Sequence, residues 1–115
     1  MNDYQRCISL SRYARWLEDE KRRETWDETI QRFIDEVVKP KVNDEGVWQW
    51  LYSNIYNMRA MPSMRALMTA GPALNRDNTS AYNCSYLVVD DPRAFDEAMF
   101  ILLCGTGVGY SVERQ

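Results

Sequence analysis

The sequence predicts an α/β fold in which a helical section, residues 1–61, is followed by a βαβ unit within residues 62–115. Three observations lead to this prediction. Apolar residues recur at helical spacing through the first half of the chain. In the second half, two short apolar runs with strand character flank an amphipathic segment, and a glycine-rich turn precedes the second run. The pattern changes once, at Met61-Pro62-Ser63.

Composition indicates a globular protein of one domain. The chain has 115 residues, of which 45% are hydrophobic, so we expect a packed core and no intrinsic disorder. The 14 basic and 17 acidic residues give a net charge of -3, which argues against a non-specific nucleic-acid binder because such proteins need an excess of Lys and Arg. No apolar run approaches the ~20 residues that cross a bilayer, and the polar N-terminus carries no signal peptide. We therefore expect a cytoplasmic protein without a membrane partner.

The clearest predicted helix begins after Thr25. Thr25 and Glu28 form the pattern of a capping box, in which each side chain accepts a hydrogen bond from the backbone N–H of the other residue. Pro40 limits the helix at its other end. The charged run before it, residues 18–24, is interpreted as a solvated face. The apolar stripe of the helix consists of Ile30, Phe33, Ile34, Val37 and Val38.

A second helix is expected to start at Asn43 or Asp44 and to end before Pro62. Its aromatic residues are interpreted as core packing and not as a ligand cage. Residues 71–78 contain Pro, Asn and Asp and are predicted to form a loop. The apolar face of the second helix consists of Val47, Leu51, Ile55 and Met58.

The second half of the chain begins with a predicted strand over residues 82–89. Both of its faces are apolar, which is typical of a strand buried in a parallel sheet. Alternation places the side chain of Cys84 on one face and those of Asn83 and Ser85 on the other. Because a two-stranded sheet leaves its outer edges without partners, we expect the sheet to be completed outside this chain.

A third helix is predicted to follow this strand. Asp91 caps it, and Pro92 is its first residue. Gly105 ends the helix, and a glycine turn leads into a second strand within residues 107–112. The apolar face of this helix consists of Phe95, Met99, Leu102 and Leu103.

Cysteine and histidine content restricts the chemistry. The chain has 3 cysteines (Cys7, Cys84 and Cys104) and no histidine. The odd number, the wide spacing and the absence of a Cys-x-x-Cys pair argue against a disulfide scaffold and a structural zinc site, so no metal site is predicted. A cysteine in an apolar strand is more often an inert buried residue than a reactive thiol, and this interpretation applies first to all three.

The second candidate for chemistry is the run Gly105-Thr106-Gly107-Val108-Gly109. Alternate glycines let the backbone approach a ligand closely, although a purely structural turn is the favoured interpretation of the run by itself. The run is not a P-loop, because no Gly-Lys-Ser/Thr follows, nor a dinucleotide fingerprint, because it precedes a strand. A βαβ connection would place the two strands side by side, so the Cys84 thiol and this backbone would face one cavity.

Several stretches together resemble the start of the catalytic barrel of ribonucleotide reductases. They are PSMRALM with the following glycine (residues 62–71), YNC (82–84), FDEAM (95–99) and GTGVGYSV (105–112). YARWL (13–17) and TWDET (25–29) resemble the monomeric, adenosylcobalamin-dependent branch of the family, including its phage-encoded members. The resemblance rests on the order and spacing of these stretches from about Ser11 to the last residue.

The resemblance implies a ten-stranded α/β barrel, incomplete in this chain, that reduces ribonucleotides by thiyl-radical chemistry with adenosylcobalamin as cofactor. Two cysteines on barrel strands supply the reducing equivalents in this family, and Cys84 in its Asn-Cys context matches the first of them. The inert interpretation of Cys84 is thereby reversed. The backbone at Thr106 and Gly107 would border the ribonucleotide substrate. Asp91 lies where related reductases begin their allosteric specificity region.

The resemblance also implies that the radical cysteine, the second reducing cysteine and most of the cobalamin surface lie beyond Gln115. We therefore expect the chain to act with the remaining C-terminal part of the reductase and a thioredoxin-type reductant, and to be inactive alone. Two alternatives stay open. One is the large subunit of a metal-radical reductase, against which the apparent lack of an N-terminal ATP-binding cone argues. The other is a non-catalytic fragment or interaction module.

Overall fold

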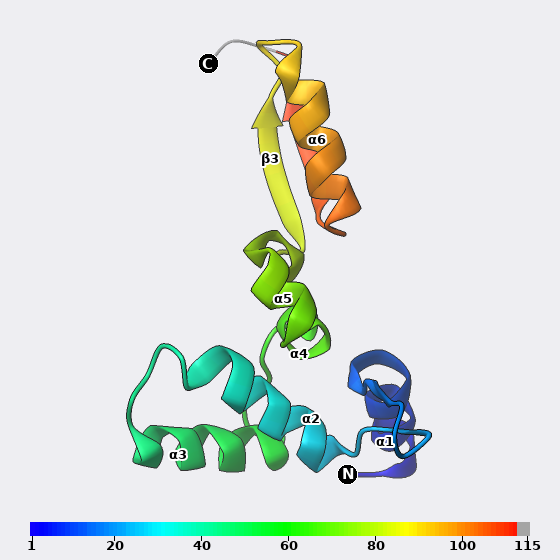
Figure 1. Cartoon of the computed structure of the whole chain (residues 1–115), viewed down its shortest axis with the longest axis vertical. Helices are drawn as coiled ribbons and strands as arrows, with labels where there is room; N and C mark the ends of the chain where they lie inside the picture. The colour runs from blue at the N-terminus through cyan, green and yellow to red at the C-terminus, as the bar shows by residue number, and fades with distance from the viewer. Residues whose placement is uncertain (113–115) are drawn as a thin grey trace.

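The computed structural model describes residues 1–112 and shows a base of helices from which a narrow arm extends (Figure 1). We call residues 1–70 the base, 71–83 the connector and 84–112 the arm. The Cα radius of gyration is 17.3 Å, whereas a compact chain of this length has about 13 Å. The molecule is therefore elongated, because the arm stands away from the base.

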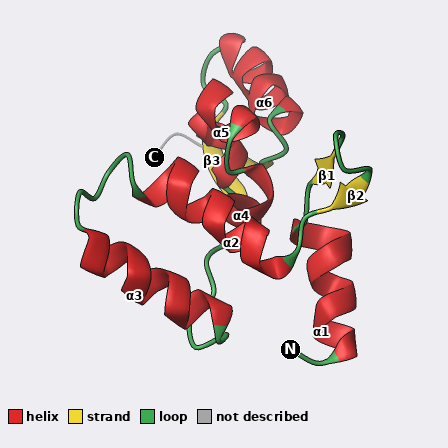
Figure 2. Cartoon of the chain, turned by 60° about the horizontal axis from the view of Figure 1, so that its bottom comes forward, coloured by secondary structure: helices red, strands yellow, loops and turns green. Residues whose placement is uncertain are grey.

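The N-terminus forms elements that the sequence patterns did not predict. Helix α1 (Asp3–Ile8) begins at a capping box between Asn2 and Gln5 and continues into the π-helical turn η1 (Ser9–Tyr13). Strands β1 (Trp16–Leu17) and β2 (Arg22–Arg23) form a small antiparallel hairpin (Figure 2). The charged run is therefore a hairpin, and its interpretation as a solvated face is wrong for Glu24, which is 5% exposed.

The two predicted helices of the base are confirmed. Helix α2 (Trp26–Phe33) begins with the Thr25–Glu28 capping box, and it continues as the π-helical segment η2 (Ile34–Val38) before Pro40. Helix α3 (Glu45–Tyr56) begins at Asp44, whose carboxylate accepts hydrogen bonds from two backbone N–H groups. Met58, which was expected on this helix, lies beyond its end with a φ of 56°.

The core of the protein lies in the base. Helices α2 and α3 lie side by side there (Figure 2), and α4 (Met64–Thr69) packs against α2. The core contains residues from both sides of residue 61. The division of the chain into sections 1–61 and 62–115 stays a prediction. The buried core residues are Ile30, Phe33, Ile34, Ile55, Leu67 and Ala70.

A buried ion pair ties α2 to α4 and to the hairpin. The Arg32 Nε atom lies 2.8 Å from Glu24 Oε1, and Arg32 Nη1 donates to the Leu67 and Ala70 carbonyls at 2.9 Å each. Burial alone would raise the pKa of Glu24, but hydrogen bonds from Arg32, from the Arg15 N–H and from Thr29 hold this pKa below its ordinary value. Glu24 is therefore charged and fully paired in the interior.

The connector is more regular than predicted. Helix α5 (Pro72–Arg76) and the 3-10 helix η3 (Asn78–Ala81) occupy most of the segment that was expected to be a loop. Pro72 takes the first helical position, where its fixed φ suits a helix and its missing N–H costs nothing. The loop prediction is therefore wrong, because proline followed by Ala-Leu is as compatible with a helix start as with a turn.

The arm is the predicted βαβ unit. Strand β3 (Cys84–Val88), helix α6 (Arg93–Leu103) and strand β4 (Gly107–Ser111) follow in order, and the strands pair in parallel with Cys84 opposite Gly107. Asp91 caps α6 by accepting a hydrogen bond from the Arg93 N–H at 2.8 Å. Pro92 was expected to be the first helical residue, but it is the N-cap residue, and the helix begins at Arg93.

Only one face of the two-stranded sheet is covered within residues 1–112. Helix α6 packs over the face that carries Leu87 and Val108, whereas Tyr86 on the other face is 56% exposed. The expected burial of β3 on both faces is thus not found, since no second layer packs on the sheet in the described part of the chain. No helix within residues 1–112 has the length and apolar character to span a membrane.

Candidate functional site

The structure brings together the two features that the sequence singled out. Cys84 is the first residue of β3, and its register partner on the neighbouring strand is Gly107, the first residue of β4. The Cys84 residue is exposed and its thiol is free. The thiol and the glycine run therefore lie at the same end of the arm, next to the connector.

The face that carries the thiol is nearly bare on the β4 side. Gly107 and Gly109 stand opposite Cys84 and Tyr86 in the register of the sheet. The one atom of the described chain within 4 Å of a Cβ atom built at Gly107 would be the Asn83 carbonyl oxygen, at 3.4 Å. Crowding within the described residues therefore does not require glycine at this position. The effect of these glycines is a strip of backbone beside the thiol that no β4 side chain covers at positions 107 and 109.

Thr106 serves as a clip between the arm and the connector. Its side chain is buried, and its hydroxyl lies 2.7 Å from the Thr79 carbonyl and 2.9 Å from the Tyr82 carbonyl. Its N–H donates to the Ile101 carbonyl, and the Gly107 N–H donates to the Asn83 carbonyl. Because these donors are already used, the run offers a ligand an open surface and not a ring of free N–H groups.

Gly105, at the end of α6, requires glycine for a conformational reason. Its φ is 85°, in the left-handed region that side chains disfavour. A Cβ atom there would also lie 2.7 Å from Nη1 of Arg65, a residue of α4. Sequence reasoning passed over Arg65, because only the packing of α4 under the arm brings its guanidinium to this turn.

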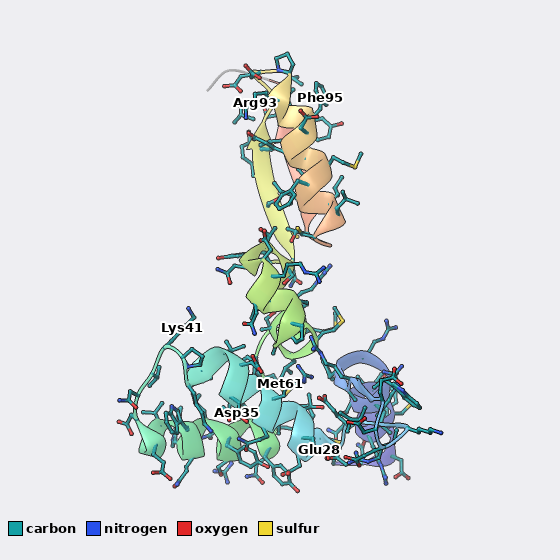
Figure 3. All side chains as sticks on the ribbon, in the orientation of Figure 1. Glu28, Asp35, Lys41, Met61, Arg93 and Phe95 are labelled. Atoms are coloured by element: carbon teal, nitrogen blue, oxygen red, sulfur yellow. The ribbon has the colours of Figure 1, made fainter. Side chains whose placement is uncertain are left out.

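Asp91 lies at the opposite end of β3 from Cys84. It precedes α6, and Arg93 and Phe95, which begin that helix, mark this distant end of the arm in Figure 3. Its carboxylate is engaged with the Arg93 N–H. The structure therefore separates Asp91 from the thiol.

The other two cysteines differ from Cys84 in setting. Cys7 lies on α1, and Cys104 ends α6 as a half-buried residue. All three thiols are free. Within the described residues, no group of three or more His, Cys, Asp or Glu side chains is arranged to hold a metal ion.

Comparison with known proteins decides the family. Residues 2–72 match the model of the ribonucleotide reductase alpha domain. The chain belongs to this family. The matched residues include nearly all of the base.

The most informative relatives are adenosylcobalamin-dependent ribonucleoside-triphosphate reductases. The protein from Lactobacillus helveticus is 26% identical over 133 aligned positions, which cover 87% of this chain and 18% of that protein. The protein from Lactobacillus leichmannii is 27% identical over 135 positions, covering 89% and 18%. The crystal structure of a B12-dependent (class II) ribonucleotide reductase matches 94% of this chain and 20% of that chain, with a TM-score of 0.75 and 26% identity. The chain thus spans about a fifth of the length of its relatives.

The names of the relatives include adenosylcobalamin, so we asked whether the described residues of this reductase segment could hold that cofactor. The open face of the arm presents the Cys84 thiol, the Tyr86 side chain and glycine backbone. The chain contains no histidine, and residues 1–112 hold no cluster of metal-binding side chains. No side-chain group that would hold the cobalt is identified within the described residues, and we assign no cobalamin contact to them.

Proposed function

We propose that this chain supplies the opening segment of the catalytic barrel of an adenosylcobalamin-dependent ribonucleoside-triphosphate reductase, which makes deoxyribonucleotides. Family membership and the structural likeness over 94% of the chain support this proposal. The names of the relatives favour the cobalamin branch over the metal-radical branch. The single observation that carries the proposal is the exposed Cys84 thiol, paired in register with Gly107 on an uncovered sheet face.

In this proposal Cys84 is one of two thiols that reduce the substrate. The bond from the 2′-carbon of the ribonucleotide to its hydroxyl breaks, the hydroxyl leaves as water with one proton, and a hydrogen takes its place on the 2′-carbon. The two thiols supply the two electrons and two protons for this change and become a disulfide. The second thiol would come from the remaining part of the reductase. A thioredoxin-type dithiol would then reduce the disulfide by exchange, for which an accessible sulfur is required. The exposure of Cys84 meets that requirement.

Thr106 and Gly107 would act in different ways in the same site. Gly107 would let the sugar lie against bare backbone beside the thiol, since no side chain fills that space. Thr106 would hold the strand in place through its two carbonyl contacts, and only its backbone would border the nucleotide. Asp91, at the distant end of the arm, would belong to an effector region and not to the reaction site.

The test is Cys84→Ser in the reductase assembled from this chain and the remaining C-terminal part. We expect multiple-turnover reduction with a thioredoxin-type reductant to be lost while folding, measured by circular dichroism, stays intact. Cys7→Ser and Cys104→Ser are the matched controls, because these thiols are also free but lie off the glycine-lined face. Unchanged multiple-turnover activity of Cys84→Ser would refute its role as a reducing thiol and favour the non-catalytic alternative.

A further inference from the structure

One of the partly buried arginines within residues 1–112 lacks the side-chain partners that the others have. Four arginines are partly buried: Arg15, Arg22, Arg32 and Arg65. Arg22 and Arg32 pair with carboxylates, and Arg15 donates to the Thr69 carbonyl. Within residues 1–112, Arg65 forms neither a side-chain hydrogen bond nor an ion pair. None of the fully buried side-chain nitrogens in the described residues lacks a hydrogen-bond partner, so the unpaired Arg65 guanidinium reaches solvent and is free to bind an acceptor from another molecule or segment.

The position of Arg65 limits what that acceptor is. Its Nη1 atom lies against Gly105, the first residue of the glycine run. Gly107, two residues further along this run, is the register partner of Cys84. The backbone N–H groups of Thr106 and Gly107 already donate within the chain. An anion that approaches this turn therefore finds one available cationic donor in the described residues next to it, the Arg65 guanidinium.

We propose that Arg65 binds the 5′-phosphates of the ribonucleotide, an inference that rests on the proposed function. Gly105 precedes Gly107 by two residues, which is about 7 Å of extended chain. Cys84 lies beside Gly107 on the neighbouring strand, and neighbouring strands are about 5 Å apart. A nucleotide whose 2′-carbon faces the thiol extends its 5′-phosphates away from the sugar over such a span. The planar guanidinium offers paired donors that match phosphate oxygens.

The test measures binding and turnover separately in the assembled reductase. The ligands are a ribonucleoside and its 5′-mono-, di- and triphosphates, and equilibrium binding is measured without turnover. Arg65→Gln removes the charge and Arg65→Lys keeps it without the paired geometry. Arg76→Gln is the matched control, because Arg76 is an exposed arginine of the neighbouring helix α5.

We expect Arg65→Gln to weaken triphosphate binding about 10- to 100-fold, the loss of a charge-assisted hydrogen bond, with a parallel rise in KM. Binding of the ribonucleoside should not change, and Arg65→Lys should fall between wild type and Arg65→Gln. Arg76→Gln should bind all four ligands as wild type does. The loss should therefore grow with the number of phosphates.

Two results would overturn this inference while the proposed function stands. One is unchanged triphosphate affinity in Arg65→Gln. The other is an equal loss for the ribonucleoside and the triphosphate, which is expected if Arg65 instead pairs with a carboxylate of the remaining reductase. If Arg65→Gln does not assemble, Arg65→Lys with wild-type triphosphate affinity and KM counts against the inference in the same way. A wild-type assembly that neither binds nor reduces ribonucleotides would overturn the proposed function itself.

Discussion

The base and the arm use apolar residues in opposite ways. In the base, the side chains of Ile30, Ile55 and Leu67 are at most 2% exposed. In the arm, Phe95 is 68% exposed and Leu103 is 79% exposed. The base therefore has a core of its own, whereas the arm is a sheet and helix whose apolar surface is largely uncovered within residues 1–112. The comparison teaches that the base is stabilised by its own packing, whereas a two-stranded sheet with one helix needs further layers to cover its apolar surface.

The strongest test of the base is Arg32→Met, which leaves Glu24 charged and buried without its partner. Breaking a buried pair costs about 3–5 kcal/mol, and we expect a loss of this size in urea denaturation followed by circular dichroism. Asp35→Asn is the control, because the Asp35–Lys39 pair is partly exposed and such pairs contribute about 0.5 kcal/mol. Similar small losses in both variants would show that the ion pair does not hold the base together.

The contrast in burial is tested by matched truncations in the two parts. Ile55→Ala removes a side chain from the core of the base and should cost about 2–5 kcal/mol in unfolding free energy. Leu103→Ala changes an exposed residue of α6 and should cost less than about 0.5 kcal/mol in the chain by itself. Equal losses measured by urea denaturation would contradict the distinction between base and arm.

The clip between connector and arm is tested by Thr106→Val. The change keeps the shape of the side chain and removes the hydroxyl that contacts the Thr79 and Tyr82 carbonyls. Losing the hydrogen bonding of this hydroxyl should cost about 0.5–1.5 kcal/mol, and the loss should concentrate in the arm. Amide hydrogen exchange should accelerate in β4 and stay unchanged in α2. Uniform acceleration would mean that the two parts unfold together.

The smallest expected effect concerns pH at the surface of the base. Hydrogen bonds from Arg22 and from the Thr25 N–H lower the pKa of Glu28 from 4.5 to about 2. Because the folded pKa lies below the unfolded one, this contribution is fully present above pH 4.5 and is lost as the pH falls through about 2. NMR titration should show Glu28 protonating near pH 2, and the stability of Glu28→Gln should depend less on pH over this range. A Glu28 pKa near 4.5 would contradict the bidentate contact.

Sequence reasoning was accurate where the deciding contacts are local. The Thr25–Glu28 capping box and the Asp44 cap join residues two or three apart, so their composition alone predicted two helix starts. Alternation along β3 correctly placed the side chains of Cys84 and Ser85 on opposite faces of the strand. The interpretation of the charged run failed because charge does not reveal which side chains a distant helix buries. The loop prediction for residues 71–78 failed because Pro-Ala-Leu suits a helix start as well as a turn.

The sequence by itself determined the capped starts of α2 and α3, the βαβ order of the arm and the pairing of Cys84 with the strand of Gly107, because helix caps, alternation and a short βαβ connection act over neighbouring residues. Only the tertiary structure decided that Glu24 is buried against Arg32 and that Arg65 reaches Gly105 without an acceptor of its own. These contacts join residues far apart in the chain, and their energies depend on burial, which exists only after the helices have packed.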